Sequence, residues 1–235
     1  MIYGPPLTSI LGYLELLDGS RLSGEDQEAL EVVEKKSRYL QRLICDFYDL
    51  SRLEKADLYL QRESVEISRL IRETVPHCYP EFEKRQLEVE LALPETAVFI
   101  VGNQEALERI LHNMIQNALR YARSHFRISV YPAGCADGCG KETGEWQEPV
   151  TGNAEEKHLI CLDFSNDTEN LAQTDILCLF DRFYMADHAR SGAGTGLGLT
   201  ISRLLTEAMG GTVAAQLTEQ GELHLIFAFQ TETNI

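Results

Sequence analysis

Four glycines at alternate positions give this sequence its clearest chemical signature. Gly192, Gly194, Gly196 and Gly198 occur in the run 192–199, directly before a predicted helix. Glycine lets the backbone approach an anion closely and adopt positive φ, and the start of a helix offers unpaired N–H groups. The run therefore predicts a phosphate-binding loop, although these glycines alone also fit a flexible loop. Its spacing matches neither G-x-G-x-x-G nor the P-loop, so it supports neither of those folds.

A second group of polar residues lies on a helix predicted over residues 103–123. Asn113 and Asn117 are four positions apart, which places both carboxamides on one face of the helix. Carboxamide oxygens suit a hard cation such as Mg²⁺. Arg120 and Tyr121 follow within the next turn. The alternative is that these asparagines simply face solvent, as most asparagines on helices do.

The elements that must position these residues follow from hydrophobic periodicity. The helix 103–123 has an apolar side formed by Leu107, Ile110, Leu111, Met114, Ile115 and Ala118. A helix is also predicted from Val65 to about Glu83, broken near Pro76 or Pro80, and another over 197–209. Strands are predicted at 58–60, 87–91, 98–101, 126–131, 159–164, 212–217 and 222–229. Residues 132–157 are predicted to form a long hairpin loop. This order predicts an α+β sandwich, with helices on one face of an antiparallel sheet.

The first part of the chain has a different pattern, that of a helical hairpin. The first helix has an apolar face of Leu7, Ile10, Leu11, Leu14 and Leu17, and Ser23 is a suitable N-cap for a second helix over about 24–55. The second helix has a stripe of Leu30, Val33, Leu40, Ile44 and Phe47. One short helix cannot cover this stripe, so we expect a homodimer in which two hairpins form a four-helix bundle. The alternative is a hairpin that packs only on its own downstream domain.

Composition narrows the classes of function. The chain has 235 residues and a formal net charge of -16, which argues against a nucleic-acid partner. No apolar run approaches the length of a bilayer span, and no signal peptide is recognised at the start. The six cysteines are scattered, as expected for reduced thiols in a cytoplasm. Cys135 and Cys139 form the only close pair, which is a weak zinc signal without further ligands.

Four segments together resemble the sensor histidine kinases of two-component systems, within the GHKL group of ATPases. Residues 112–121, HNMIQNALRY, resemble the N box; residues 180–184, FDRFY, resemble the F box; and residues 192–199, GAGTGLGL, resemble the second glycine box. Residues 6–12, PLTSILG, resemble the end of the H box. The resemblance covers nearly the whole chain. It implies a dimerisation hairpin over 1–58 and a catalytic, Bergerat-type α/β sandwich over 61–235, with a mixed, mostly antiparallel sheet.

The resemblance also implies roles for individual residues. It implies that Asn113 and Asn117 contact Mg²⁺ and the phosphates of ATP, that Arg120 meets phosphate oxygens and that Tyr121 lines the adenine pocket. Phe180, Phe183 and Tyr184 would anchor an ATP lid over about 185–193, in which Arg190 could reach phosphate. The implied nucleotide-binding residues in and after the lid are Arg190, Gly192, Gly194, Thr195, Gly196, Leu197 and Gly198.

The sequence departs from the family pattern at two boxes. The first glycine box, normally Asp-x-Gly-x-Gly, falls on residues 166–170, NDTEN, so Asn166 replaces the aspartate that reads the adenine amino group. An amide oxygen can still accept that hydrogen bond, and the neighbouring Asp167 is the alternative reader. In the H box, Met1 stands where the phosphoacceptor histidine would be, and Ile2 and Pro5 replace its polar neighbours.

These departures leave alternative interpretations open. One interpretation is a kinase cut at the H box, whose intact form would transfer the γ-phosphate of ATP to a histidine and then to an aspartate of a response regulator. A second is a dimeric regulatory module without kinase activity that docks a response regulator. A third is another GHKL ATPase, against which the hairpin argues. We expect a cytoplasmic location, with any membrane contact made by a sensor segment outside this chain.

Overall fold

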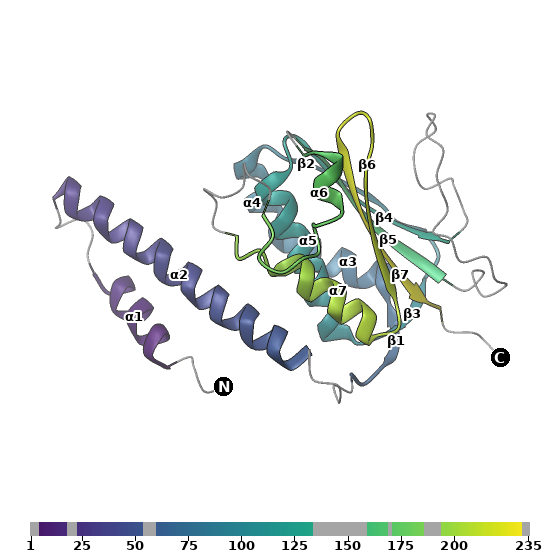
Figure 1. The fold of residues 1–235 in the computed structure, drawn as a ribbon, viewed down its shortest axis with the longest axis horizontal. Helices are drawn as coiled ribbons and strands as arrows, with labels where there is room; N and C mark the ends of the chain where they lie inside the picture. The colour runs from purple at the N-terminus through teal and green to yellow at the C-terminus, as the bar shows by residue number, and fades with distance from the viewer. Residues whose placement is uncertain are drawn as a thin grey trace.

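The computed structural model describes residues 5–17, 23–53, 60–133, 159–168, 171–185 and 194–231. It begins with a helical hairpin, in which α1 (Pro5–Glu15) lies alongside the much longer α2 (Gly24–Leu53) (Figure 1). The Ser23 hydroxyl accepts a hydrogen bond from the Asp26 backbone N–H at 3.3 Å, as expected of an N-cap. The predicted hairpin is therefore confirmed.

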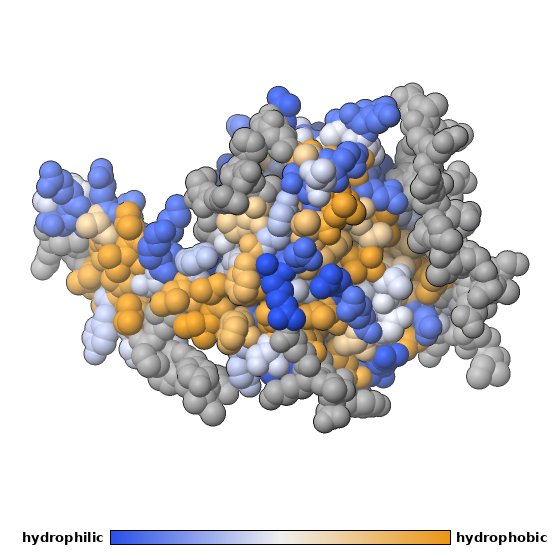
Figure 2. Space-filling model, viewed as in Figure 1, coloured by the Kyte–Doolittle hydropathy of each residue, from blue (hydrophilic) through white to orange (hydrophobic). Residues whose placement is uncertain are grey.

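The apolar stripe of α2 is divided between two surroundings. Leu50 is buried, and Leu43 and Leu53 pack against the core of the downstream part of the chain. Val33, Leu40 and Phe47 are instead 48%, 45% and 61% exposed. Figure 2 shows hydrophobic surface over the two helices of the hairpin. The hairpin thus packs on its own downstream domain and still presents an uncovered apolar face.

A five-stranded mixed sheet forms the centre of the downstream part. Its strands, in spatial order, are β2 (Glu88–Ala92), β4 (His125–Pro132), β5 (Leu159–Asp167), β7 (Glu222–Gln230) and β6 (Thr212–Leu217). Only the β2–β4 pair is parallel; the other three pairs are antiparallel. The predicted α+β class and the predicted pairing of the strands at 126–131 and 159–164 are confirmed.

Helices cover one face of this sheet (Figure 1). They include α3 (Ile67–Thr74), α5 (Gln104–Tyr121) and α7 (Gly198–Ala208). The shorter α4 (Tyr79–Arg85) follows a 3-10 turn at Val75–Cys78, and α6 (Gln173–Ile176) precedes the F box. The apolar sides of α5 and α7 pack on alternate strand residues such as Phe164, Leu225 and Phe227, which are at most 2% exposed. This packing fixes which side of α5 remains available for a ligand.

A second, two-stranded sheet was not predicted. It pairs β1 (Glu63–Glu66) with β3 (Phe99–Gly102) in antiparallel register. Val65 therefore belongs to a strand, and the prediction that it begins a helix was wrong. Of the strand predicted over 58–60, residues 58 and 59 lie outside the described residues, and Leu60 is not in a strand. The predicted helix break near Pro76 is confirmed by the 3-10 turn.

Among the described residues, no helix is both long and apolar enough to span a membrane. The two longest, α2 and α5, are interrupted by charged residues along their length.

Candidate functional site

The N box residues lie on α5, and its start and its packing determine which way they face. The helix begins after Asn103, whose Oδ1 accepts the Ala106 backbone N–H at 3.0 Å. The apolar side of α5 is fully buried, so the opposite side, with Asn113, Asn117 and Arg120, faces a cavity. The two asparagines therefore lie on one face of α5, as predicted.

The second glycine box forms the opposite wall of this cavity, with a tight contact at Gly194 and a conformation that requires glycine at Gly196. A Cβ on Gly194 would lie 3.2 Å from the Tyr121 hydroxyl and 3.5 Å from Arg120 Nη1. At Gly196, φ is +68°, and a Cβ would lie 2.8 Å from the backbone of Phe183. Glycine at these positions therefore allows a close approach of the loop to α5 and to the F box.

A direct hydrogen bond joins the N box to the glycine box. Asn113 Nδ2 donates to the Gly198 carbonyl and to the Ser202 hydroxyl, both at 3.0 Å. These bonds fix the Asn113 carboxamide on the first turn of α7 and leave its Oδ1 as the remaining acceptor. The Asn117 carboxamide is half-buried and has no hydrogen bond to any other described residue. Asn117 is therefore the freer of the two oxygen ligands for Mg²⁺.

The cavity has a volume of about 1070 Å³, enough for a nucleotide. It brings together most of the residues predicted from the sequence: Asn113, Asn117, Arg120, Tyr121, Gly194, Thr195, Gly196 and Gly198. Leu197 is buried behind the wall at the N-cap position of α7. Met1, Arg190 and Gly192 lie outside the described residues.

The first glycine box has lost its glycines but keeps a defined geometry. Asn166 is only 3% exposed at the end of β5, where its Nδ2 donates to the Asp167 carbonyl at 2.9 Å. No described residue donates a hydrogen bond to its Oδ1. Its strand partner on β7, Leu223, lines the cavity. Asn166 itself is not among the residues that line the cavity; it pairs with one of them and has one acceptor unused.

Asp167, in contrast, has a structural role at the start of β4. Its carboxylate accepts the backbone N–H groups of Arg123, Ser124 and His125, and the Ser124 hydroxyl at 2.6 Å. Desolvation by itself would raise the pKa of Asp167, but these hydrogen bonds outweigh it and lower the pKa to about 2. Both carboxylate oxygens are engaged at the start of β4, which argues against the alternative that Asp167 reads adenine.

The F box is fastened to the glycine box through the backbone. The Phe183 N–H donates to the Gly196 carbonyl at 3.0 Å, and the Thr200 hydroxyl donates to the Phe180 carbonyl at 3.0 Å. The Tyr184 hydroxyl donates to Asp175 at 2.6 Å. Phe183 is 59% exposed with φ of +60°, so its ring is not a core residue. Most of the predicted lid, residues 186–193, lies outside the described part of the chain.

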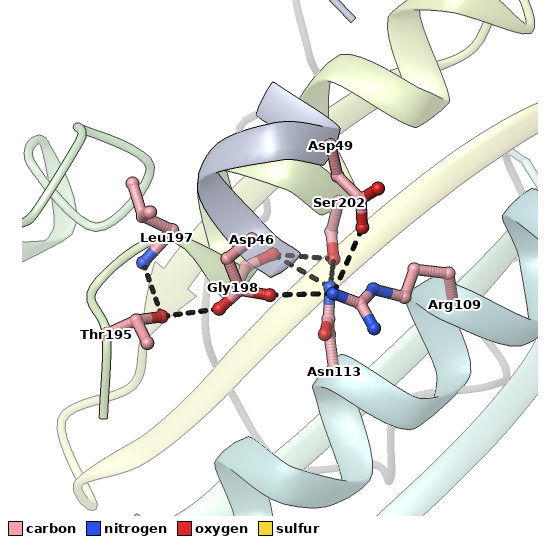
Figure 3. A network of polar contacts seen from close by, with 8 residues as sticks. All are labelled: Asp46, Asp49, Arg109, Asn113, Thr195, Leu197, Gly198 and Ser202. Carbon is pink, nitrogen blue, oxygen red and sulfur yellow. Dashed lines mark hydrogen bonds and ion pairs between the residues drawn. The ribbon is translucent and has the colours of Figure 1, made fainter. Parts of the chain in front are cut away.

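The sequence did not predict that α2 would form a wall of the cavity. Gln41, Arg42, Cys45 and Asp46 all line it. Asp46 accepts a hydrogen bond from Arg109 at 2.7 Å and another from the Thr195 hydroxyl at 2.7 Å (Figure 3). Arg109 lies four residues before Asn113 on α5, a spacing that could have indicated its position. No local pattern points to Asp46, because its partner Thr195 is 149 residues away.

Positive charge gathers on the cavity walls. Burial, followed by the nearby Arg42 guanidinium, lowers the pKa of Arg120, which remains a cation at neutral pH. Desolvation and the Arg109 guanidinium lower the pKa of His112. No described residue makes a hydrogen bond or ion pair with Arg42. Five arginines line the cavity: Arg42, Arg85, Arg109, Arg120 and Arg123. Arg109 is paired with the carboxylates of Asp46 and Asp49. So many guanidiniums around one cavity create a field that favours a multiply charged anion.

Two family models match the chain. The model described as histidine kinase-, DNA gyrase B- and HSP90-like ATPase matches residues 102–233, more than half of the chain. The phosphoacceptor domain of histidine kinases matches residues 5–56. The chain belongs to the sensor histidine kinases. The N box, the F box and the second glycine box therefore lie in the ATPase segment, as the sequence predicted. The boundaries 1–58 and 61–235 stay predictions.

Relatives match this chain over nearly its whole length. Sensor histidine kinase YcbM of Bacillus subtilis is 30% identical over 215 residues, which cover 90% of this chain and 62% of YcbM. Sensor protein VanS of Enterococcus faecium is 25% identical, over 90% of this chain and 50% of VanS. The chain thus spans less than two thirds of these curated relatives.

Solved structures confirm the fold. The crystal structure of full-length ShkA in complex with AMPPNP matches 97% of this chain and 44% of that chain, with a TM-score of 0.71 and 21% identity. The Acinetobacter baumannii histidine kinase AdeS matches 97% of this chain and 96% of that chain, with a TM-score of 0.63 and 19% identity. At such identities the likeness concerns the fold alone.

Proposed function

We propose that this chain binds Mg-ATP in the cavity between α5 and the second glycine box. The observation that carries the proposal is the pair of hydrogen bonds from Asn113 to Gly198 and Ser202, which holds the N box against the start of α7. A helix N-terminus, a glycine loop and the unpaired Asn117 carboxamide then face the same space. This combination suits phosphates and a hard cation.

Each proposed contact uses a group that the chain leaves available. Asn117 would supply an oxygen to Mg²⁺, with Asn113 Oδ1 as a second ligand. Arg120 would meet the phosphates, and Tyr121, 37% exposed beside Gly194, would line the adenine end. Asn166 Oδ1 would accept the adenine amino group. Bound Mg²⁺ would neutralise phosphate charge, which lowers the barrier to phosphoryl transfer. Arg190, Gly192 and Leu197 remain proposed members of the site.

In the intact enzyme we propose that the γ-phosphate passes to a histidine and then to an aspartate of a response regulator. A histidine nitrogen forms the new bond to phosphorus while the bond to the β-phosphate oxygen breaks, and ADP leaves. The homodimer, the response-regulator partner and a membrane-anchored sensor segment belong to this proposal for the whole protein. The match of residues 5–56 to the phosphoacceptor domain supports the dimer and the regulator in general terms.

Calorimetric titration with Mg-ATP tests the nucleotide site. We expect saturable binding to the natural chain and a loss of at least about tenfold in affinity for Asn117→Ala, since a metal ligand disappears from an otherwise intact helix. Circular dichroism should give the same folded spectrum for both proteins. If neither the folded natural chain nor a folded Asp46→Asn variant bound Mg-ATP, the proposed nucleotide site would be wrong.

A second candidate function is a dimeric regulatory module that docks a response regulator without kinase activity. The observation that favours it is Met1 at the phosphoacceptor position, together with the replaced first glycine box. A Met1→His, Ile2→Glu variant, produced behind an added start methionine, separates the two candidates. Vigorous autophosphorylation with ATP would support a kinase cut at its H box. A nucleotide-bound but unphosphorylated variant would support the regulatory module.

A further inference from the structure

One side chain of α2 occupies an unusual place for an acidic residue, at the wall of a cavity proposed to bind phosphates. Asp46 lines this cavity together with Gln41, Arg42 and Cys45. Its side chain is only 14% exposed. A carboxylate with so little contact with water must be held by donors, because an unpaired buried charge is strongly unfavourable.

Both donors that hold Asp46 belong to the nucleotide-binding segment. The Thr195 hydroxyl donates to one carboxylate oxygen at 2.7 Å, and Arg109 Nη2 donates to the other at 2.7 Å (Figure 3). Thr195 Oγ1 in turn accepts the backbone N–H of Leu197, the N-cap residue of α7, at 3.3 Å. The carboxylate is thereby placed at the positive end of that helix.

These donors are of the kind that a nucleotide phosphate requires. A hydroxyl of the glycine loop, the start of a helix and a guanidinium are the usual anion-binding groups of proteins. Arg109 also has a buried Nε with no acceptor among the described residues. A carboxylate and a phosphate on the same donors would repel each other, because both are negative.

We propose that Asp46 is an internal competitor of the nucleotide phosphates and thereby sets the affinity of the site for ATP. The inference rests on the proposed Mg-ATP site. The carboxylate of α2 occupies Thr195 and Arg109 when the cavity is empty, and the phosphates displace it. Thermodynamic linkage makes the effect reciprocal. The contact of α2 with the glycine box lowers the affinity for nucleotide, and bound nucleotide weakens that contact by the same factor. Any movement of the hairpin that withdraws Asp46 then raises the affinity for ATP.

Asp46→Ala tests the competition, with Asp49→Ala as its matched control. Asp49 lies on the same helix and contacts the same Arg109 at 3.3 Å, and no hydrogen bond joins it to Thr195. We expect Asp46→Ala to tighten Mg-ATP binding at least about fivefold, within the usual range of coupling between sites. Asp49→Ala should change the affinity by less than about twofold. The isosteric Asp46→Asn, which keeps an acceptor for Thr195 but loses the charge, should lie between them and replaces Asp46→Ala if that variant fails to fold.

Adenosine distinguishes competition with phosphates from a general opening of the cavity. Because adenosine carries no phosphate, its binding should be the same in the natural chain and in Asp46→Ala, measured by displacement of a fluorescent adenine analogue. An equal gain for adenosine and ATP would overturn the proposal, and so would unchanged or weaker ATP binding to Asp46→Ala.

The outcomes also separate this inference from the proposed nucleotide site. Equal ATP binding by all variants would overturn the competition and leave the nucleotide site standing. No ATP binding by any folded variant would overturn both. Binding only by Asp46→Ala or Asp46→Asn would support both, with the carboxylate strong enough to keep the natural cavity closed to ATP.

Discussion

The carboxamide at position 166 and the carboxylate at position 167 are adjacent in sequence but serve different ends. Asn166 is buried with an unused acceptor, whereas Asp167 binds three successive backbone N–H groups at the start of β4. Side chains alternate between the two faces of a strand, so neighbours on β5 point in opposite directions. Only Asn166 shares the face of Phe164 and of the helices. Asn166 therefore offers an acceptor without a charge to the proposed adenine site.

A pair of alanine substitutions separates these two roles. We expect Asn166→Ala to weaken Mg-ATP binding about tenfold, since one hydrogen bond to the base is lost. We expect Asp167→Ala to lower the free energy of unfolding by about 1 to 3 kcal/mol, because three backbone donors lose their acceptor, and to change ATP affinity by less than about twofold. Calorimetry and urea unfolding measure the two effects. A large affinity loss in Asp167→Ala alone would reverse the assignment.

At the scale of elements, a buried charged cluster joins β5 to β7 on the sheet face opposite the helices. His224 Nδ1 is 2.9 Å from Asp163, and His224 Nε2 is 3.8 Å from Glu222. Burial by itself would lower the pKa of His224, but the hydrogen bond with Asp163 and the nearby carboxylate of Glu222 outweigh it and raise the pKa to about 9. The close contact with His224 lowers the pKa of Glu222 to about 2, against the opposing effect of desolvation. The imidazolium thus links carboxylates of two neighbouring strands.

This cluster predicts a definite dependence of stability on pH. Because the pKa of His224 is higher in the folded state than the ordinary 6.5, its stabilisation is complete below about pH 6.5 and is lost as pH rises through about 9. For Glu222 the stabilisation is present above about pH 4.5 and is lost as pH falls toward 2. We expect His224→Gln to lower the unfolding free energy by about 1 to 3 kcal/mol at pH 6. The difference from the natural chain should shrink between pH 6.5 and 9; a constant difference up to pH 10 would contradict this interpretation.

At the scale of the molecule, α2 serves two partners at once. Leu43, Leu50 and Leu53 pack on the hydrophobic core of the downstream domain. Asp46 accepts a hydrogen bond from Thr195 of the glycine box. Val33, Leu40 and Phe47 repeat every seven residues and remain exposed, which is the spacing of a seam between helices. The proposed dimer and the proposed competition with nucleotide would therefore both act through α2.

A charge substitution in this seam should abolish the dimer. We expect Val33→Glu combined with Leu40→Glu to raise the dimer dissociation constant by about two orders of magnitude or more, because carboxylates would be buried against apolar partners. Light scattering after gel filtration gives the mass. Val32→Glu is the control: Val32 is 56% exposed but lies off the seam. A dimer that survives the double substitution would mean that copies associate through another surface.

The sequence alone determined most of the fold and much of the site. Apolar residues at helical spacing fixed which side of α5 is buried, so Asn113, Asn117 and Arg120 had to share the other side. The alternating glycines before α7 determined where an anion could approach the backbone. Both inferences depend on interactions within one helix or one turn, and local patterns are sufficient for those.

Tertiary structure decided what separate segments do to one another. The pairing of β1 with β3, the cap that Asp167 places on β4 and the contact of Asp46 with Thr195 each join residues far apart in the chain. None of these contacts produces a periodic pattern in the sequence, because a single polar residue reads the same whether its side chain faces water or a partner. Such contacts exist only once the packing of the sheet and helices has set the distances between segments. For that reason, only the folded molecule shows that α2 forms one wall of the cavity.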